Sequence, residues 1–143
     1  MSRGPSYSVA DYDAMFADPV RTPAYLAAIA KTVKAGDVVV EIGTGVGYFA
    51  VAAAKAGARH VYAIERDPVI ALAEQVVREN GLSDRITCVR GDSKRLTLPE
   101  RGAGLIADLR GVLPLHGDAI ATIVHAREKL LAPGAKVIAR IDT

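Results

Sequence analysis

Three glycines alternate with other residues directly after an apolar segment that carries an acidic residue near its end. The apolar segment is Val38–Ile42, its acidic residue is Glu41, and the turn that follows contains Gly43, Thr44, Gly45 and Gly47. Residues typical of a helix come next. A strand, a tight glycine turn and the N-terminus of a helix let the backbone approach a nucleotide-like ligand closely. The spacing therefore predicts a ligand-binding turn.

The details of this turn favour one kind of ligand. A dinucleotide-binding fingerprint reads G-x-G-x-x-G, whereas this chain reads G-x-G-x-G and has Tyr48 where the third glycine would stand. The carboxylate of Glu41 would repel a pyrophosphate, but it would suit a ligand that carries an amino or a sulfonium group. S-adenosylmethionine carries both groups and no phosphate. The turn therefore predicts this cofactor rather than NAD(P).

Acidic residues at the ends of two further apolar segments extend the predicted site. Glu65 lies about 20 residues after Gly43, a spacing that suits a carboxylate accepting hydrogen bonds from both ribose hydroxyls. NAD enzymes use the same device, so Glu65 indicates an adenosine cofactor without choosing between the two. Asp92 follows the third segment and is placed to accept a hydrogen bond from an adenine amino group. The predicted adenosine-binding set is Glu65, Arg66, Asp92 and Ser93.

The elements that would position these residues alternate regularly. Strands are expected at 38–42, 60–64, 86–90, 105–108 and 135–141, and helices at 9–16, 23–34, 46–56, 68–80 and 118–131. Thr22 is the expected N-cap of the second helix, with Pro23 at its first position. This order predicts an α/β fold, a Rossmann-like, doubly wound, mostly parallel sheet of about five strands. Glycines also form ordinary turns and a strand-end carboxylate can simply be solvated, but the order of the elements favours a cofactor site at the carboxyl ends of the strands.

Composition narrows the class of protein. The chain has 143 residues, half of them hydrophobic, which suits one domain with a sizeable core. Lysine and arginine (18) nearly balance aspartate and glutamate (16), and this balance favours neither a nucleic acid nor a membrane as partner. The single cysteine, Cys88, permits no internal disulfide and is expected to be a small buried hydrophobe. No cysteine–histidine cluster predicts a metal, and no apolar leader or span is present in the sequence, so we expect a cytoplasmic location.

Four segments together resemble the cofactor domain of class I S-adenosylmethionine-dependent methyltransferases, and more narrowly the protein arginine methyltransferase family and its bacterial relatives. The segments are 7–29, 39–47, 52–65 and 124–134. The first is similar to the family's cofactor-covering segment and is more specific than the glycine motif. The resemblance implies a disordered N-terminus over 1–7, cofactor-covering helices over 8–34 and a Rossmann-like binding domain over 35–143.

The resemblance also implies roles for single residues around the cofactor. Arg21 would pair with the cofactor's carboxylate, for which a guanidinium is well shaped. Glu65 would hold the ribose, and the turn from Gly43 to Gly47 would lie under the methionyl part. Met15 would pack near the reacting centre.

The substrate-binding loop departs from the family pattern. Arginine methyltransferases carry two glutamates there that grip the substrate guanidinium; Asp108 falls on the first, and Gly117 falls on the second, beside Asp118. Arg110 adds a positive charge that a cationic acceptor would not need. We expect Asp108 to orient the acceptor, with a capping or salt-bridge role as the alternative. His116 and Asp118 are the candidate bases, although a solvent-exposed loop residue is the plainer interpretation of His116.

The sequence therefore predicts a methyltransferase that acts on a peptide, a protein or a small molecule. One alternative is a cofactor-binding module that is inactive alone, because the family's β-barrel, which builds half of the substrate cleft, would come after the point where this sequence ends, Thr143. A homodimer or a partner domain would then complete the cleft. A third possibility, an NAD(P)-binding oxidoreductase domain, is disfavoured by Glu41 and Tyr48.

Overall fold

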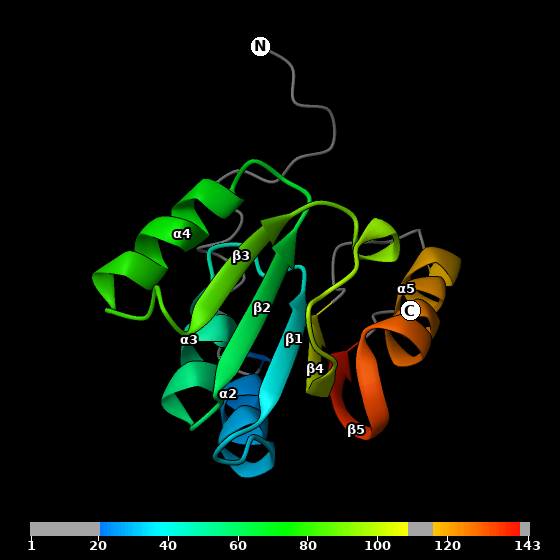
Figure 1. Ribbon diagram of the computed structural model, residues 1–143, viewed down its shortest axis with the longest axis horizontal. Helices are drawn as coiled ribbons and strands as arrows, with labels where there is room; N and C mark the ends of the chain where they lie inside the picture. The colour runs from blue at the N-terminus through cyan, green and yellow to red at the C-terminus, as the bar shows by residue number, and fades with distance from the viewer. Residues whose placement is uncertain (1–20, 109–115, 141–143) are drawn as a thin grey trace.

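The sheet that the sequence predicts is present and all of its strands are parallel. A computed structural model describes residues 21–108 and 116–140, apart from the side chains of residues 21, 108, 116–119 and 140. The elements are α2 (Arg21–Thr32), β1 (Val38–Ile42), α3 (Tyr48–Lys55), β2 (His60–Glu65), α4 (Ile70–Glu79), β3 (Ile86–Arg90), the 3-10 turn η1 (Ser93–Arg95), β4 (Gly102–Asp108), α5 (His116–Lys129) and β5 (Leu131–Arg140). The strand order is β3-β2-β1-β4-β5 (Figure 1). The expected helix over 9–16 lies outside the described residues.

The central strand β1 is buried along its whole length. Its sequence is VVVEI, and a continuous apolar run of this kind is typical of a parallel strand that is covered on both faces. β1 pairs with β2 on one side and β4 on the other, with Glu41 opposite Ala63 and Ile106. The register therefore brings the carboxyl ends of β1, β2 and β4 to the same edge of the sheet.

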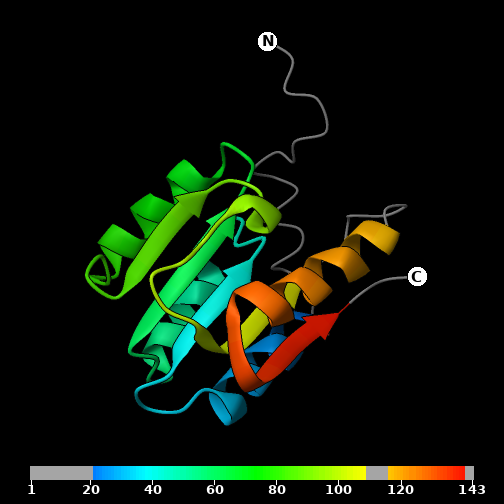
Figure 2. The same cartoon turned by 45° about the vertical axis from the view of Figure 1, so that its right-hand side comes forward.

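Helices cover the two faces of the sheet. Helices α2, α3 and α4 share one apolar cluster with alternate residues of the strands, and α5 shares a second cluster with the other face (Figure 2). The rings of Tyr25 in α2 and Phe49 in α3 stack with their centroids 5.1 Å apart. Helix α3 is alanine-rich, and its buried alanines let the helix lie close against the sheet.

Several expected boundaries are wrong by a few residues. Helix α2 begins at Arg21, so Thr22 lies inside the helix and is not its N-cap. Strand β4 begins three residues earlier than expected because Gly102, which reads as a loop residue, pairs with Leu131 across an irregular register. A Cβ at Gly102 would lie 2.9 Å from Val40 Cγ2, so only glycine fits there. Strand β5 accepts Pro133 because it is an edge strand, where a missing N–H is tolerated.

Helices α3 and α4 begin two residues later than expected, and the residues that cap and follow α4 are those that the sequence predicts. Helix α3 begins at Tyr48, two residues later than expected, because Gly43–Gly47 forms the turn before it. Helix α4 begins at Ile70 rather than at residue 68 and ends at Glu79, one residue before the expected end. Asn80 caps it and Gly81, with φ 68°, follows, as the sequence predicts.

Gly47 allows α3 and α4 to approach each other. It has φ 87°, and a Cβ there would lie 3.3 Å from Ala73 Cβ and 3.4 Å from Ala73 Cα. Ala73 is fully buried on α4, so α4 would have to give by a few tenths of an ångström at this contact. Gly36 has φ 89° but nothing within 4 Å of its Cβ position, and it therefore isolates the cost of the backbone conformation.

We expect Gly47→Ala to lower the free energy of unfolding more than Gly36→Ala. Both variants lose about 1 kcal/mol because alanine disfavours a left-handed conformation, and Gly47→Ala loses roughly a further 1–3 kcal/mol from overpacking against α4. Urea unfolding of the two variants and the parent measures this difference. Equal losses would show that the contact with Ala73 is not a constraint.

Candidate cofactor site

The turn between β1 and α3 has a backbone that requires glycine at alternate positions. Gly43, Gly45 and Gly47 have φ values of 81°, 56° and 87°, which glycine adopts without steric cost. The N–H groups of Gly43 and Thr44 both donate to the carbonyl of Ile64, at 2.8 and 3.0 Å. The turn, called the glycine loop below (residues 43–47), is therefore fastened to the end of β2.

Glu41 lies beneath the glycine loop rather than at an open rim. Its side chain is 2% exposed, and its Oε1 accepts a hydrogen bond from Thr44 Oγ1 at 2.6 Å. Burial raises the pKa of Glu41 from its ordinary 4.5 to about 7, against the lowering effect of the Thr44 hydrogen bond and with a further increase from the nearby Glu65. At neutral pH the group is thus divided between the neutral and the ionised form.

Glu65 supports the same loop from the neighbouring strand. Its side chain is 7% exposed; Oε1 accepts from the N–H of Gly45 at 2.9 Å and Oε2 accepts from the N–H of Asp67 at 3.0 Å. Burial raises the pKa of Glu65, and these backbone hydrogen bonds oppose that increase. The N–H of Arg66 contributes a further backbone hydrogen bond. Because an ionised carboxylate has about four acceptor positions, Glu65 retains capacity for a ligand hydroxyl.

Two buried carboxyl groups therefore flank one backbone turn. Thr44 and Gly45, which are adjacent in the loop, donate hydrogen bonds to Glu41 and Glu65, respectively. When ionised, each carboxylate would need a positive charge nearby to offset its burial. No lysine or arginine in the described segments is paired with Glu41 or Glu65. Burying acidic groups without a counter-charge is costly, so the arrangement suits a ligand that brings positive charge and disfavours a pyrophosphate.

The residues expected at the adenine edge lie beyond β3. Asp92 caps η1 by accepting, through Oδ1, the N–H of Lys94 at 3.0 Å. Ser93 is 4% exposed, and Arg66 is exposed directly after Glu65. The structure brings Asp92 and Ser93 to the same edge as Glu65, since β3 pairs with β2 and Glu65 lies opposite Arg90.

One supporting residue was missed from the sequence. The N–H of Asp67 donates to Glu65, and its own Oδ1 accepts from the N–H of Val69 at 3.1 Å. This is the local turn that an aspartate forms with the residue two positions on. The signal was the sequence Asp67-Pro68 after a strand end, which was interpreted only as the start of a helix.

The remaining predicted residues are placed by their backbone alone or not at all. Arg21 is the first residue of α2, Asp108 is the last of β4 opposite Arg140, and His116 and Asp118 lie in the first turn of α5. Their side chains are outside the description, as is the whole of Met15. The backbone thus puts Asp108 at the same strand edge as Glu41 and Glu65.

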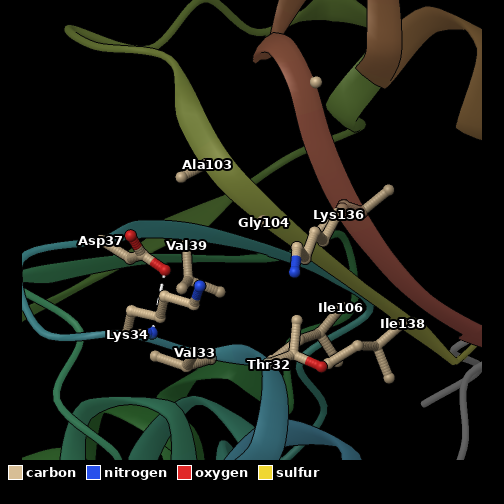
Figure 3. A pocket seen from close by; sticks show the side chains of 12 residues that line it. Thr32, Val33, Lys34, Asp37, Val39, Ala103, Gly104, Ile106, Lys136 and Ile138 are labelled. Atoms are coloured by element: carbon tan, nitrogen blue, oxygen red, sulfur yellow. Dashed lines mark hydrogen bonds between the residues drawn. The ribbon is translucent and has the colours of Figure 1, made fainter.

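A separate hollow lies between the end of α2 and the strands β1, β4 and β5 (Figure 3). It has a volume of about 170 Å³, with Lys34, Asp37 and Lys136 among its polar residues. The glycine loop does not line it, so this hollow is not the predicted cofactor site.

Other reactive groups in the described residues do not form a second site. Cys88 is half-buried and burial raises its pKa to about 11, so its thiol stays protonated at neutral pH. Within residues 21–108 and 116–140, no group of histidine, cysteine or acidic side chains is arranged to hold a metal. None of the described helices is long and apolar enough to cross a membrane.

A family model described as the TRM5/TYW2 methyltransferase domain matches residues 3–125. The chain belongs to this family of methyltransferase domains. The predicted class of protein is thereby confirmed, although the family model carries a different name from the arginine methyltransferases that the sequence resembles.

The narrower resemblance, to arginine methyltransferases, is found among curated proteins and among solved structures. Protein arginine N-methyltransferase 1 of Chlamydomonas reinhardtii is 33% identical over 130 residues, which are 89% of this chain and 38% of that protein. Arabidopsis thaliana protein arginine methyltransferase 10 has a TM-score of 0.81 at 30% identity, over 88% of this chain and 37% of that one. The Trypanosoma brucei PRMT1 enzyme–prozyme heterotetrameric complex with AdoHcy has a TM-score of 0.85 at 29% identity, over 92% and 42%. The chain thus spans well under half the length of these relatives.

The buried position of Glu41 predicts how stability depends on pH. Because its pKa is raised from 4.5 to about 7, the folded protein holds a proton that the unfolded chain has released across this window. The contribution of Glu41 to stability is therefore full below about pH 4.5 and is lost as pH rises through 7, by roughly 3 kcal/mol in total. Glu41→Gln should lack this loss. The free energy of unfolding of the variant should therefore rise relative to that of the parent between pH 5 and 8.

Unfolding in urea at several pH values measures the difference between the two proteins. Glu65 titrates in both proteins, so only its interaction with Glu41 differs between them. Glu100→Gln is the matched control, since Arg59 and Tyr62 lower the pKa of Glu100 and its contribution has the opposite sign. If the free energy of unfolding depended on pH in the same way in the parent and in Glu41→Gln, the raised pKa of Glu41 would be contradicted.

Proposed function

We propose that this chain binds S-adenosylmethionine and serves methyl transfer to a peptide, a protein or a small-molecule acceptor. The observation that carries the proposal is the glycine loop held between two buried carboxyl groups that have no cationic partner in the described residues. Membership of a methyltransferase domain family supports it, as does the similarity to an arginine methyltransferase complex that contains AdoHcy.

The residues present fit this cofactor. Glu65 retains acceptor positions for ribose hydroxyls at the end of β2, and Asp92 lies at the end of β3, where the adenine would reach it. Gly43, Thr44, Gly45 and Gly47 would lie under the methionyl part. We assign Arg21, at the start of α2, to the cofactor's carboxylate, Met15 to the reacting centre and Arg66 and Ser93 to the adenosine edge. The domain limits we propose are 8–34 for the cofactor-covering segment and 35–143 for the binding domain.

The chemistry would need little more from the protein than alignment and exclusion of water. Bound S-adenosylmethionine supplies an already activated methyl group for in-line displacement. Asp108, at the end of β4, would orient the acceptor toward that methyl. His116 or Asp118 would take a proton only when the acceptor arrives protonated.

The rest of the substrate cleft would come from another domain or another chain. The relatives extend far beyond the matched region, and the Trypanosoma brucei protein is an assembly of two kinds of subunit. We therefore propose that a second copy or a partner domain completes the cleft, and that the isolated chain binds cofactor even if it needs that partner for turnover. With one cysteine and no possible internal disulfide, we place the protein in the reducing cytoplasm.

Cofactor affinity tests the assigned roles. Calorimetric titration with S-adenosylmethionine, S-adenosylhomocysteine and NAD should show binding of the first two and not of NAD. Glu65→Gln and Arg21→Ala should each weaken binding by about 10- to 100-fold, because each removes charge-assisted hydrogen bonds to the ligand.

Matched changes elsewhere separate these effects from general loss of charge. Lys31→Ala removes a cation from the other end of α2, and Glu100→Gln removes a carboxylate near the beginning of the sheet. Both controls should keep the parent's affinity. Unchanged affinity in Glu65→Gln and Arg21→Ala would remove the site assignment, and binding of NAD alone would overturn the proposed function.

Turnover tests the role of Asp108. With the chain and any partner that it needs, release of S-adenosylhomocysteine is measured on arginine peptides, lysine peptides and small amines. Asp108→Asn should lower kcat by roughly 10- to 100-fold, since the acceptor loses its alignment, while the affinity for S-adenosylmethionine stays within about twofold. A variant that loses both in equal proportion would indicate a structural role instead.

A further inference from the structure

The charge of the ligand changes during the proposed reaction, and this bears on Glu41. S-adenosylmethionine carries a sulfonium, whereas its product S-adenosylhomocysteine carries a neutral thioether in the same place. Apart from this charge, the two ligands differ only in the transferred methyl group. A group that interacts with this one charge can therefore distinguish the donor from the product.

Glu41 is placed to make that distinction from beneath the glycine loop. It is the most deeply buried acidic group of the described site, and it is fastened through Thr44 to the loop proposed to carry the methionyl part. A charge in such a dry position acts over several ångströms because water does not screen it. The hydrogen bond to Thr44 also makes the position of the loop depend on this carboxyl group.

We propose that Glu41 sets the preference of the site for the positively charged donor over the neutral product, and that it does so as a carboxylate held under the glycine loop by Thr44. This inference rests on the proposed function. It goes beyond that function because it assigns control over which ligand stays bound to one buried residue beneath the glycine loop.

Among the described residues, the ionisable groups that interact with Glu41 are acidic. Glu65 on β2 raises the pKa of Glu41. The charges of Glu74 on α4 and of Glu41 both raise the pKa of Cys88 on β3. Along these elements the described residues thus supply no cation that would hold Glu41 ionised. A cationic ligand is the counter-charge that they lack.

A dependence on pH follows, with a definite direction. Near pH 6 Glu41 is mostly protonated and discriminates little, because its pKa is about 7. Near pH 8 it is ionised and attracts the sulfonium. The ratio of the dissociation constant of the product to that of the donor should therefore rise with pH. If binding of the donor lowers the pKa of Glu41 by about one unit, the rise is about fivefold between pH 6 and 8.

The test is this ratio, measured by calorimetry between pH 6 and 8. Glu41→Gln should give a flat ratio and thereby corrects for any titration of the ligands themselves. Thr44→Ser keeps the hydroxyl and should keep the parent profile, whereas Thr44→Val removes it and should move the rise to higher pH. Glu74→Gln, an exposed change on α4, should leave the profile unchanged.

A second measurement needs no variant. At pH 7, binding of the donor to the parent protein should release a fraction of a proton, seen as a heat that depends on the ionisation enthalpy of the buffer. Binding of the product should release less. The inference fails if both ligands bind with a ratio independent of pH, or if Glu41→Gln keeps the slope. If neither ligand binds at any pH, the proposed function itself fails.

Discussion

The site depends on keeping two carboxyl groups out of water at the centre of a parallel sheet. Glu41 belongs to a strand that is buried along its whole length, and Glu65 ends the neighbouring strand. Burial of an acidic group costs free energy unless hydrogen bonds offset it. The glycine loop supplies those bonds, since Thr44 donates its hydroxyl to Glu41 and Gly45 donates its N–H to Glu65. The loop conformation and the burial of the two acids therefore require each other.

The topology of the sheet makes this arrangement possible. The order β3-β2-β1-β4-β5 has its reversal at β1, because the chain proceeds to one side through β2 and β3 and returns to the other side with β4. In open α/β sheets the loops diverge at such a point and leave room for a ligand beyond the carboxyl ends of the strands. Residues far apart in the sequence, Glu41, Glu65, Asp92 and Asp108, meet at this edge because all five strands run in the same direction.

The sequence predicted element bounds correctly where a run of apolar, β-branched residues favoured a single kind of element. Strands β1 and β3 have the expected bounds because valine and isoleucine runs leave little alternative to a buried strand. The beginnings of β4 and β5 were missed because Gly102 and Pro133 are typical of loops; their places in strands depend on close packing against Val40 and on the edge position of β5. Such tertiary effects have no local signal.

The two acids of the site are a different case. The sequence marked Glu41 and Glu65 as important but predicted Glu41 as a carboxylate facing the ligand, not as a buried group. A signal for its burial was present, because Glu41 lies within an otherwise apolar strand and shares a face with Val39, which packs in the core under α3. The hydrogen bond that makes the burial tolerable comes from Thr44, a residue that the glycine pattern treats as a spacer.

One equilibrium, the ionisation of buried Glu41, both lowers the stability of the fold and provides the proposed preference for a cationic ligand. Across the pH range in which its ionisation lowers the stability of the folded chain, the same ionisation creates an attraction for a cation. A cationic ligand that binds there recovers part of the free energy lost to burial, and a neutral ligand recovers none. Polar groups that destabilise a fold and persist at its binding edge are commonly explained by function. A hydrophobic residue at position 41 would make a more stable sheet, but it would leave the glycine loop without its anchor and the site without a means of sensing the ligand's charge.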